Sequence, residues 1–403
     1  MLKRPTQAVI LAGGRGTRLM PLTKTLPKPM VSFHGKPFLE YLIESVRDQG
    51  FERILLLLGY LPSAIQDYFG DGSEWGVRIE YSITDVHNET GRRIKLAQSL
   101  IDPVFLLMYC DNYWPMRFDR MWSRYEETGA EVQLTVYRNK DNYTRHNVQI
   151  DDKGRVVQYD RDWRAKHLEG VDIGFALLKR GAIDLLPDNN VSFENTVYNR
   201  FLAARKLYAF VTEHRYYSVG GHDRLELTRD FLKRRPTVLV DRDGVLNKKM
   251  APSEYVRSWK DWSWLPGSRK ALAMFREKGY RVVVVSNQAG VARGVMSQDD
   301  LTRIHERMTA EVEQARGHID SIYACTHGWD EGCECRKPKP GLLFAAQRDL
   351  SLDLSRTVFI GDDDRDQMAA DAAGCPSLKV TPQQQLIDHA RRIVASAGSQ
   401  GQE

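Results

Sequence analysis

The most constraining feature of this chain is a series of short, continuously apolar runs that alternate with helical patterns, because the series occurs twice. The first consists of AVILA, a helical pattern near residues 37–49, RILLLLG and VFLLMYCD. The second consists of TVLVDRD, a helical pattern near residues 268–278, RVVVVSN and TVFIGDD. Strands that are apolar at every position are buried on both faces, as in parallel sheets covered by helices. The sequence therefore predicts an α/β protein of two domains, each with a mostly parallel sheet between layers of helices.

The second series begins near residues 234–236, and this restart marks the expected domain boundary. A chain of 403 residues is also too long for one ordinary core. We therefore predict one domain at residues 1–235, with a helical stretch at 223–233 near its end, and another at residues 236–395. Residues 396–403, rich in Ser, Gly and Gln, are expected to form a frayed tail. Such sheets bind ligands at the carboxyl ends of their strands, so we expect the functional residues there.

Composition and charge exclude some classes of protein. The chain is 42% hydrophobic and 28% charged, as is usual for a globular protein. The net charge of +5 is spread along the chain rather than gathered in a basic stripe, which argues against a nucleic-acid partner. No apolar stretch approaches the roughly 20 residues of a membrane span, and the run at residues 8–12 is too short for a signal peptide. We expect a cytoplasmic protein with no membrane partner, for which a homo-oligomer is an open option.

A glycine-rich loop directly follows the first apolar run. It reads Leu11-Ala12-Gly13-Gly14-Arg15-Gly16-Thr17-Arg18-Leu19. Glycines let the backbone approach a phosphate and leave N–H groups free to bind an anion. Arg15 and Arg18 can add charge-assisted bonds to a triphosphate. Ten residues further on, Pro27-Lys28-Pro29 fixes an extended segment that carries one lysine. Residues 11–17 are therefore a predicted nucleotide-binding loop.

This combination of a strand, GGRGTR, the pair Leu22-Thr23 and PKP resembles the signature of the sugar-1-phosphate nucleotidyltransferases over residues 7–235. The resemblance implies that a sugar 1-phosphate oxygen attacks the α-phosphorus of a nucleoside triphosphate and releases pyrophosphate. Such a displacement needs positive charge around the phosphates, including Mg²⁺. By the resemblance, Lys28 and Arg18 supply charge and Asp111, after the strand VFLLMYC, binds the metal.

Three positions depart from that family pattern. Ser218 stands where the family has its second magnesium-binding aspartate, residues 89–93 read ETGRR where a base-contacting loop usually reads like GTGGA, and Arg161 takes the place of a lysine. A serine hydroxyl binds Mg²⁺ more weakly than a carboxylate does. Three options stay open: one carboxylate suffices, a nearby acid such as Asp223 is recruited, or the domain binds sugar nucleotides without turning them over.

The second series opens with two acids at the end of its first strand, Asp241 and Asp243. One of two such acids can attack phosphorus, while the other protonates the leaving oxygen and later deprotonates water. The next strand ends in Ser286, whose hydroxyl can bind a phosphoryl oxygen, and Lys337 follows as a cation. The strand TVFIG then leads to a run of acids that can bind magnesium: Asp362, Asp363, Asp364 and Asp366.

These four elements, in this order, resemble the haloacid-dehalogenase-type phosphatases over residues 236–390. The resemblance implies a second Rossmann-like three-layer domain and an aspartyl-phosphate formed on Asp241, with Asp243 as acid and base. It assigns Ser286 and Lys337 to the transferred phosphoryl group. It also implies a magnesium site formed by Asp241, Asp243 and Asp362, with the help of the other acids left open. Little more than one helix separates the first two strands, so we expect no large cap domain.

Three of the five cysteines cluster with a histidine as Cys325-x-His327-x5-Cys333-x-Cys335. Three thiolates and an imidazole complete a tetrahedral Zn²⁺ site with no open position, which favours a structural role. Clustering of this kind in a protein that is not secreted argues against disulfides. The cluster leads directly into Arg336-Lys337, so zinc is expected to rigidify the loop that presents both. Cys110 and Cys375 are expected to be inert.

DRDGVLN, NQAGVARG at residues 287–294 and C-x-H…C-x-C-R-K-P together resemble the heptose bisphosphate phosphatases, with the histidinol-phosphate phosphatases as near relatives. The resemblance implies removal of the 7-phosphate of D-glycero-D-manno-heptose 1,7-bisphosphate, with substrate contacts from Asn247, Asn287, Arg293 and Arg336. The product would feed a nucleotidyltransferase that resembles the heptose 1-phosphate guanylyltransferases, giving GDP-heptose. Alternatives are a non-catalytic sugar-nucleotide-binding first domain, a histidinol-phosphate phosphatase, and a scaffold with two inactive sites.

Overall fold

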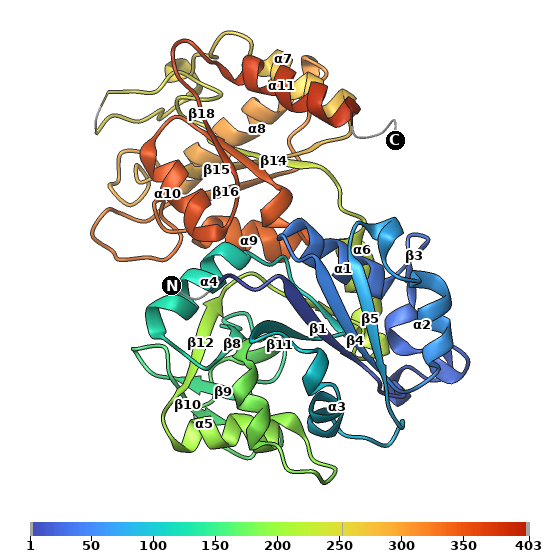
Figure 1. Cartoon of the computed structure of the whole chain (residues 1–403). Helices are drawn as coiled ribbons and strands as arrows, with labels where there is room; N and C mark the ends of the chain where they lie inside the picture. The colour runs from blue at the N-terminus through green and yellow to red at the C-terminus, as the bar shows by residue number, and fades with distance from the viewer. Residues whose placement is uncertain (1–2, 252, 400–403) are drawn as a thin grey trace. The chain divides into compact units, whose positions relative to one another are not determined.

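The computed structural model of the chain describes residues 3–251 and 253–399 (Figure 1). The chain divides into two compact units, residues 1–233 and 234–403. Helix α6 (His222–Leu232) ends the first unit, and strand β14 (Thr237–Val240) opens the second. Within the described residues, no helix is both long and apolar enough to cross a membrane.

A seven-stranded sheet forms the centre of the first unit. Strand β11 runs antiparallel to its two neighbours, and the other six strands are parallel to one another. The order across the sheet is β12 (Leu207–Thr212), β8 (Val132–Tyr137), β11 (Val171–Lys179), β6 (Val104–Tyr109), β1 (Gln7–Ala12), β4 (Arg53–Leu58) and β5 (Arg78–Ile83). Three short pairs accompany it: β2 (Ser32–Phe33) with β3 (Lys36–Pro37), β7 (Asn112–Tyr113) with β13 (Tyr217–Ser218), and β9 (Val148–Ile150) with β10 (Val156–Tyr159).

Helices cover both faces of this sheet, because successive side chains of a strand point to opposite faces. Ala8 and Ile10 of β1 pack in one buried cluster, and Val9 and Leu11 pack in another. The first cluster contains residues of α1 (Phe38–Asp48), α2 (Pro62–Phe69), α4 (Phe118–Thr128) and α6. The second contains residues of α3 (Thr90–Leu96) and α5 (Asn199–Ala203) (Figure 1).

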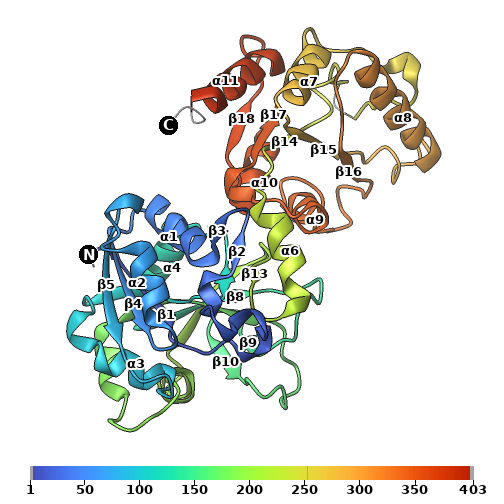
Figure 2. The ribbon, with the colours of Figure 1, turned by 90° about the vertical axis from the view of Figure 1, so that its right-hand side faces the viewer.

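The second unit has a smaller sheet of five strands, all parallel. Their order is β16 (Ser321–Cys325), β15 (Arg281–Asn287), β14, β17 (Val358–Gly361) and β18 (Ser377–Lys379). Val238 and Val240 pack against α7 (Ser268–Glu277), α8 (Gln298–Gln314) and α11 (Leu386–Ser399). Leu239 faces the opposite layer, formed by α9 (Gly341–Leu350) and α10 (Asp364–Ala373) (Figure 2).

The predicted fold class of two α/β units with mostly parallel sheets is confirmed. Between β14 and β15 the described residues hold only one 3-10 turn, η8 (Trp259–Asp261), and α7, so no large cap is inserted there. Helix α11 extends to Ser399, whereas a frayed tail was expected over residues 396–403, and residues 400–403 lie outside the described part of the chain. The apolar side chains of α11 up to Val394 pack in the core beside α7.

Candidate active sites

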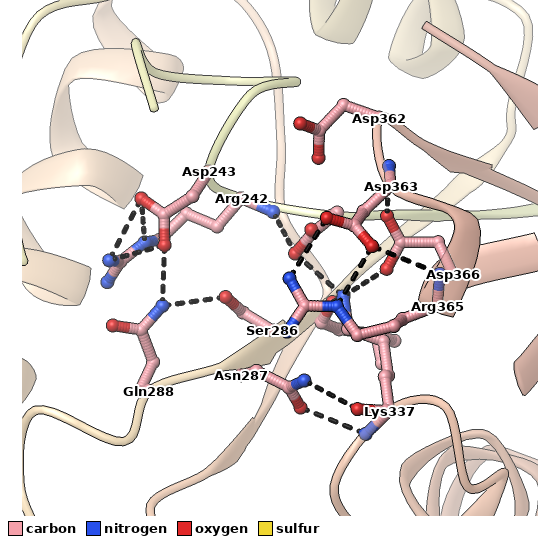
Figure 3. A network of polar contacts seen from close by, with 12 residues as sticks. Arg242, Asp243, Ser286, Asn287, Gln288, Lys337, Asp362, Asp363, Arg365 and Asp366 are labelled. Carbon is pink, nitrogen blue, oxygen red and sulfur yellow. Dashed lines mark hydrogen bonds and ion pairs between the residues drawn. The ribbon is translucent and has the colours of Figure 1, made fainter. Parts of the chain in front are cut away.

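Lys337 links the carboxylates at the carboxyl end of the second unit's sheet (Figure 3). Its Nζ lies 2.9 Å from Oδ1 of Asp241 and 2.7 Å from Oδ1 of Asp366, and it donates to the carbonyl oxygen of Val285. The side chain is only 2% exposed. Burial opposes its charge, but the two carboxylates hold the pKa of Lys337 above its ordinary value. The predicted nucleophile and the predicted cation therefore meet as an ion pair.

Asp241, Asp362 and Asp366 each place an oxygen within 4.8 Å of the others. Oδ2 of Asp362 accepts from Lys249, whereas its Oδ1 is buried and has no hydrogen-bond partner among the described residues. An orphaned carboxylate oxygen beside two further carboxylates is the donor set that a hard cation such as Mg²⁺ prefers. The residues present therefore fit a magnesium ion.

Two glycines keep space for these carboxylates. A Cβ on Gly244, whose φ is 84°, would collide with the carboxylate of Asp362, and a Cβ on Gly361 would collide with that of Asp366. Any other residue at either position would displace a carboxylate of the cluster. Gly244 is thus needed for its left-handed backbone and for the close approach of Asp362.

The side chain of Asp243 does not join the cluster, in contrast to the predicted magnesium set. It accepts hydrogen bonds from Arg242 (2.9 Å), Asn247 (2.8 Å) and Gln288 (2.8 Å). Burial raises the pKa of Asp243, but Arg242 and the two amides outweigh it and hold that pKa below its ordinary value. Figure 3 shows Asp243 and Asp366 in separate parts of the network. Asp366 takes the place in the cluster that the sequence assigned to Asp243.

The other two acids of the run have other partners. Asp363 caps α10, accepts from the backbone N–H of Arg365 and also binds the side chains of Arg365 and Lys249. Asp364 is exposed and pairs with Lys379. Of the three acids that the sequence left open, only Asp366 lies with Asp241 and Asp362.

A cavity of about 520 Å³ opens above this network. The residues predicted to bind substrate differ in whether they line this cavity. Asn287 lines it and exchanges two hydrogen bonds of 3.0 Å with the backbone of Lys337. Arg336 lines it with a buried Nη1 that has no partner among the described residues. Asn247, predicted to bind substrate, is fully buried and orients Asp243 instead, because its amide donates to that carboxylate.

Several residues of the site were missed at the level of sequence. The sequence predicted Ser286 but not Gln288, whose amide donates both to the Ser286 hydroxyl and to the carboxylate of Asp243. Arg242, inside the DRDG motif, is 1% exposed and contacts His305 at 3.3 Å. Burial, together with Arg242, lowers the pKa of His305 to about 4. Arg242 and Gln288 stand within the motifs DRDGVLN and NQAGVARG, but contacts between sequence-distant segments carry no local signal.

The cysteine cluster has the geometry of a metal site. Sγ of Cys335 lies 3.3 Å from Sγ of Cys325, 3.6 Å from Sγ of Cys333 and 3.2 Å from Nδ1 of His327. A tetrahedron with zinc–sulfur bonds of about 2.3 Å has edges of about 3.8 Å. Four donors gathered so closely, without disulfides among them, fit a zinc ion. Cys110 and Cys375 are buried apart from this cluster.

The glycine-rich loop borders a cavity of about 530 Å³ in the first unit. Lys28 and Asp111 meet in this cavity, with Nζ 2.7 Å from Oδ2. The loop lines it with Leu11, Gly13, Gly14, Arg15, Gly16, Thr17 and Arg18. Ala12, also predicted to bind nucleotide, lies in the core because strand alternation turns it away from Leu11.

The structure shows where the residues lie that depart from the nucleotidyltransferase family pattern. Arg93 is buried and donates to the carbonyl oxygens of Leu58, Asp85 and Val86, so it supports the cavity wall rather than facing solvent. Ser218 pairs with Asn112 of β7, directly after Asp111. Asp223 is 78% exposed and pairs with Arg224. Among the described residues that line this cavity, the acids are Asp111 and Glu89.

Arg161 lines a neighbouring cavity of about 600 Å³, to which Glu89 also contributes. It pairs at 2.9 Å with Glu194, which is 3% exposed and also bonds Tyr109. The buried carboxyl of Asp172, whose pKa burial raises to about 6, accepts from a tyrosine hydroxyl nearby. Arg161 and the acids Glu89, Asp160 and Asp162 therefore border a cavity that shares Glu89 with the nucleotide loop's cavity.

The two units match different families of known proteins. A nucleotidyl transferase family model matches residues 7–160, and a polynucleotide kinase 3 phosphatase model matches residues 237–383. D-glycero-beta-D-manno-heptose-1,7-bisphosphate 7-phosphatase of Bordetella bronchiseptica is 40% identical over 138 residues, covering 34% of this chain and 76% of the relative. The protein of that name from Rhodopseudomonas palustris is 34% identical over 177 residues, covering 40% and 97%. HddC from Yersinia pseudotuberculosis, solved with GMP-PN, is 27% identical with a TM-score of 0.50, covering 57% and 100%.

Proposed function

The chain belongs, through its second unit, to the D-glycero-beta-D-manno-heptose-1,7-bisphosphate 7-phosphatase family, and from this premise we propose that this unit removes the 7-phosphate of that heptose bisphosphate. The chain is an enzyme that combines a phosphatase with a nucleotidyltransferase. In the proposed sequence, the heptose 1-phosphate product receives a nucleotidyl group in the first unit. GMP is the proposed group, which the GMP-PN bound by HddC supports. Nucleoside triphosphates are cytoplasmic, and we place the reaction there.

Asp241 is the proposed nucleophile of the phosphatase. Its carboxylate attacks phosphorus of the 7-phosphate, the bond between phosphorus and the C7 oxygen breaks, and Asp243 gives that oxygen a proton. Water that Asp243 deprotonates then attacks the aspartyl-phosphate and releases inorganic phosphate. Arg242 holds the pKa of Asp243 low, and a bound phosphate dianion would raise it, because like charges disfavour ionisation. The same group can thus serve as acid before it serves as base.

Lys337 and Ser286 are the proposed contacts of the transferred phosphoryl group. Asp241, Asp362 and Asp366 would hold magnesium, which supplies positive charge that lets a carboxylate approach an anionic phosphate. The observation that carries the phosphatase proposal is the ion pair of Asp241 with Lys337, beside the orphaned Oδ1 of Asp362. In the first unit, Lys28, Arg15 and Arg18 are the proposed triphosphate contacts, with Asp111 as the metal-binding acid.

Phosphate and pyrophosphate release test the proposal directly. With magnesium, the enzyme is expected to release one phosphate per molecule of D-glycero-D-manno-heptose 1,7-bisphosphate, and pyrophosphate only after a nucleoside triphosphate is added. GTP is expected to give the fastest pyrophosphate release in a panel of four nucleotides. Histidinol phosphate serves as the comparison substrate. Faster turnover of histidinol phosphate than of the heptose bisphosphate would contradict the proposed substrate, and preference for another nucleotide would contradict GMP transfer.

Cys325, His327, Cys333 and Cys335 are proposed to hold one structural zinc ion. Cys333→Ser is expected to remove zinc from the purified chain and to lower phosphate release at least about tenfold, because the cluster leads into Lys337. Pyrophosphate release from supplied heptose 1-phosphate and GTP should change less than twofold. Metal analysis and both assays check this, with Cys375→Ser as a control that replaces a buried cysteine outside the cluster. Zinc absent from the unmodified chain, or full phosphatase activity without it, would remove the proposal.

A further inference from the structure

Arg293 lies beside the phosphatase cavity, in contact with Tyr255 and Trp329, two residues from other loops that line it. The guanidinium carbon of Arg293 lies 4.8 Å from the ring centre of Trp329 and 5.9 Å from that of Tyr255. Its Nη1 also lies 3.3 Å from the hydroxyl of Tyr255. Tyr255 precedes η8, Arg293 follows β15, and Trp329 belongs to the loop between His327 and Cys333. Arg293 is therefore held between two aromatic side chains from different segments.

Trp329 is unusual for a large apolar residue because it is 59% exposed. It lines the cavity above Asp241 and also a neighbouring cavity of about 460 Å³. The charged residues that line this second cavity are all cationic: Arg336, Lys337, Lys339 and Arg365. An exposed indole at the boundary of a basic cavity and a reaction centre has no packing role that explains it. Its position suits contact with a ligand that extends away from Asp241.

The cavity above Asp241 is much larger than one phosphoryl group. Its volume of about 520 Å³ leaves room for a sugar beyond the reacting phosphate. A second phosphate on that sugar needs a cation at a distance from Lys337. An isolated exposed arginine would lose much side-chain freedom on binding it, whereas an arginine already stacked on aromatic rings loses less. The stacked Arg293 is thus a preorganised anion receptor.

We propose that Trp329 determines the preference of the phosphatase for bisphosphorylated sugars, by holding Arg293 where it binds the phosphate that is not hydrolysed. This inference rests on the proposed function. Trp329 acts as a positioning residue for Arg293. The zinc cluster fixes the loop that carries Trp329, so the same metal supports the reaction centre through Lys337 and the selection of substrate through Trp329.

Two substrates that share the reacting phosphate test this role in the full-length enzyme. Trp329→Ala is expected to raise KM for heptose 1,7-bisphosphate about tenfold with kcat within twofold, and to leave kcat/KM for heptose 7-phosphate within twofold. Trp329→Phe, which keeps an aromatic face, should restore KM to within threefold. Trp163→Ala, which removes a similarly exposed tryptophan (53%) from the first unit, is the matched control and should change the kinetics of neither substrate.

Arg293→Ala and the double variant complete the test. If Trp329 acts through Arg293, the double variant is expected to lose no more than Arg293→Ala alone. An unchanged KM in Trp329→Ala, an equal loss with both substrates, or additive losses in the double variant would each overturn the inference. Wild-type enzyme that releases no phosphate from the bisphosphate would overturn the proposed function and this inference with it. Wild-type turnover combined with an unaffected Trp329→Ala would overturn the inference alone.

Discussion

Asp241→Asn is expected to abolish phosphate release, by roughly 10⁴-fold or more, while pyrophosphate release from supplied heptose 1-phosphate and GTP stays within twofold of the wild type. An amide has neither the charge nor the nucleophilicity of the carboxylate that attacks phosphorus. The substitution also removes one carboxylate from the cluster that fits magnesium. Lys337 keeps its ion pair with Asp366 and its bond to the carbonyl of Val285, so its charge stays compensated and the fold is expected to hold.

The matched control is Asp363→Asn, the same change of charge at an acid of the same run. Asp363 caps α10 through the backbone N–H of Arg365, and asparagine caps helices about as well as aspartate. This variant is expected to keep phosphate release within about fivefold. Assays of released phosphate, with thermal unfolding of both variants, make the comparison. More than about 1% residual activity in Asp241→Asn, at wild-type stability, would overturn the nucleophile assignment.

The fold was predictable from the sequence because its signals are local. Continuous apolar runs such as Val238–Val240 require burial on both faces of a sheet, and the structure places alternate residues of this strand in opposite core clusters. The carboxyl-end rule then places Asp241, Ser286 and Asp362 at one edge, since each lies at or follows the end of a parallel strand. For these three residues, the position at the end of a strand was sufficient to predict the edge of the sheet at which they lie.

Side-chain direction in the loops was not predictable, because distant contacts decide it. Asp243 turns toward Gln288, 45 positions away in the sequence, so the third acid of the cluster is Asp366. Lys249 reaches Asp362 across 113 positions. No periodicity or motif encodes contacts of this range. Asn247 shows the same limit, because its place in the DRDGVLN motif does not reveal that it faces Asp243 in the interior.

Asp111→Asn is expected to lower pyrophosphate release about 10²- to 10³-fold and to leave phosphate release within twofold, the reciprocal of the Asp241 result. Asp111 pairs with Lys28 at 2.7 Å inside the cavity of the glycine-rich loop. The substitution removes the acid proposed to bind metal there and leaves Lys28 facing an amide. Coupled detection of pyrophosphate with heptose 1-phosphate and GTP measures the loss.

Asp223→Asn tests whether Asp223 supplies the second metal-binding carboxylate, which the family has at the position of Ser218. Asp223 is 78% exposed, pairs with Arg224 and is not among the described residues that line the cavity. Its substitution is therefore expected to leave pyrophosphate release unchanged, which would mean that one protein carboxylate suffices where Ser218 replaces an aspartate. An equal loss in both variants would show that Asp223 moves into the site with substrate bound. Full activity in Asp111→Asn would contradict the assignment of Asp111, because no other acid in the cavity lies beside Lys28 among the described contacts.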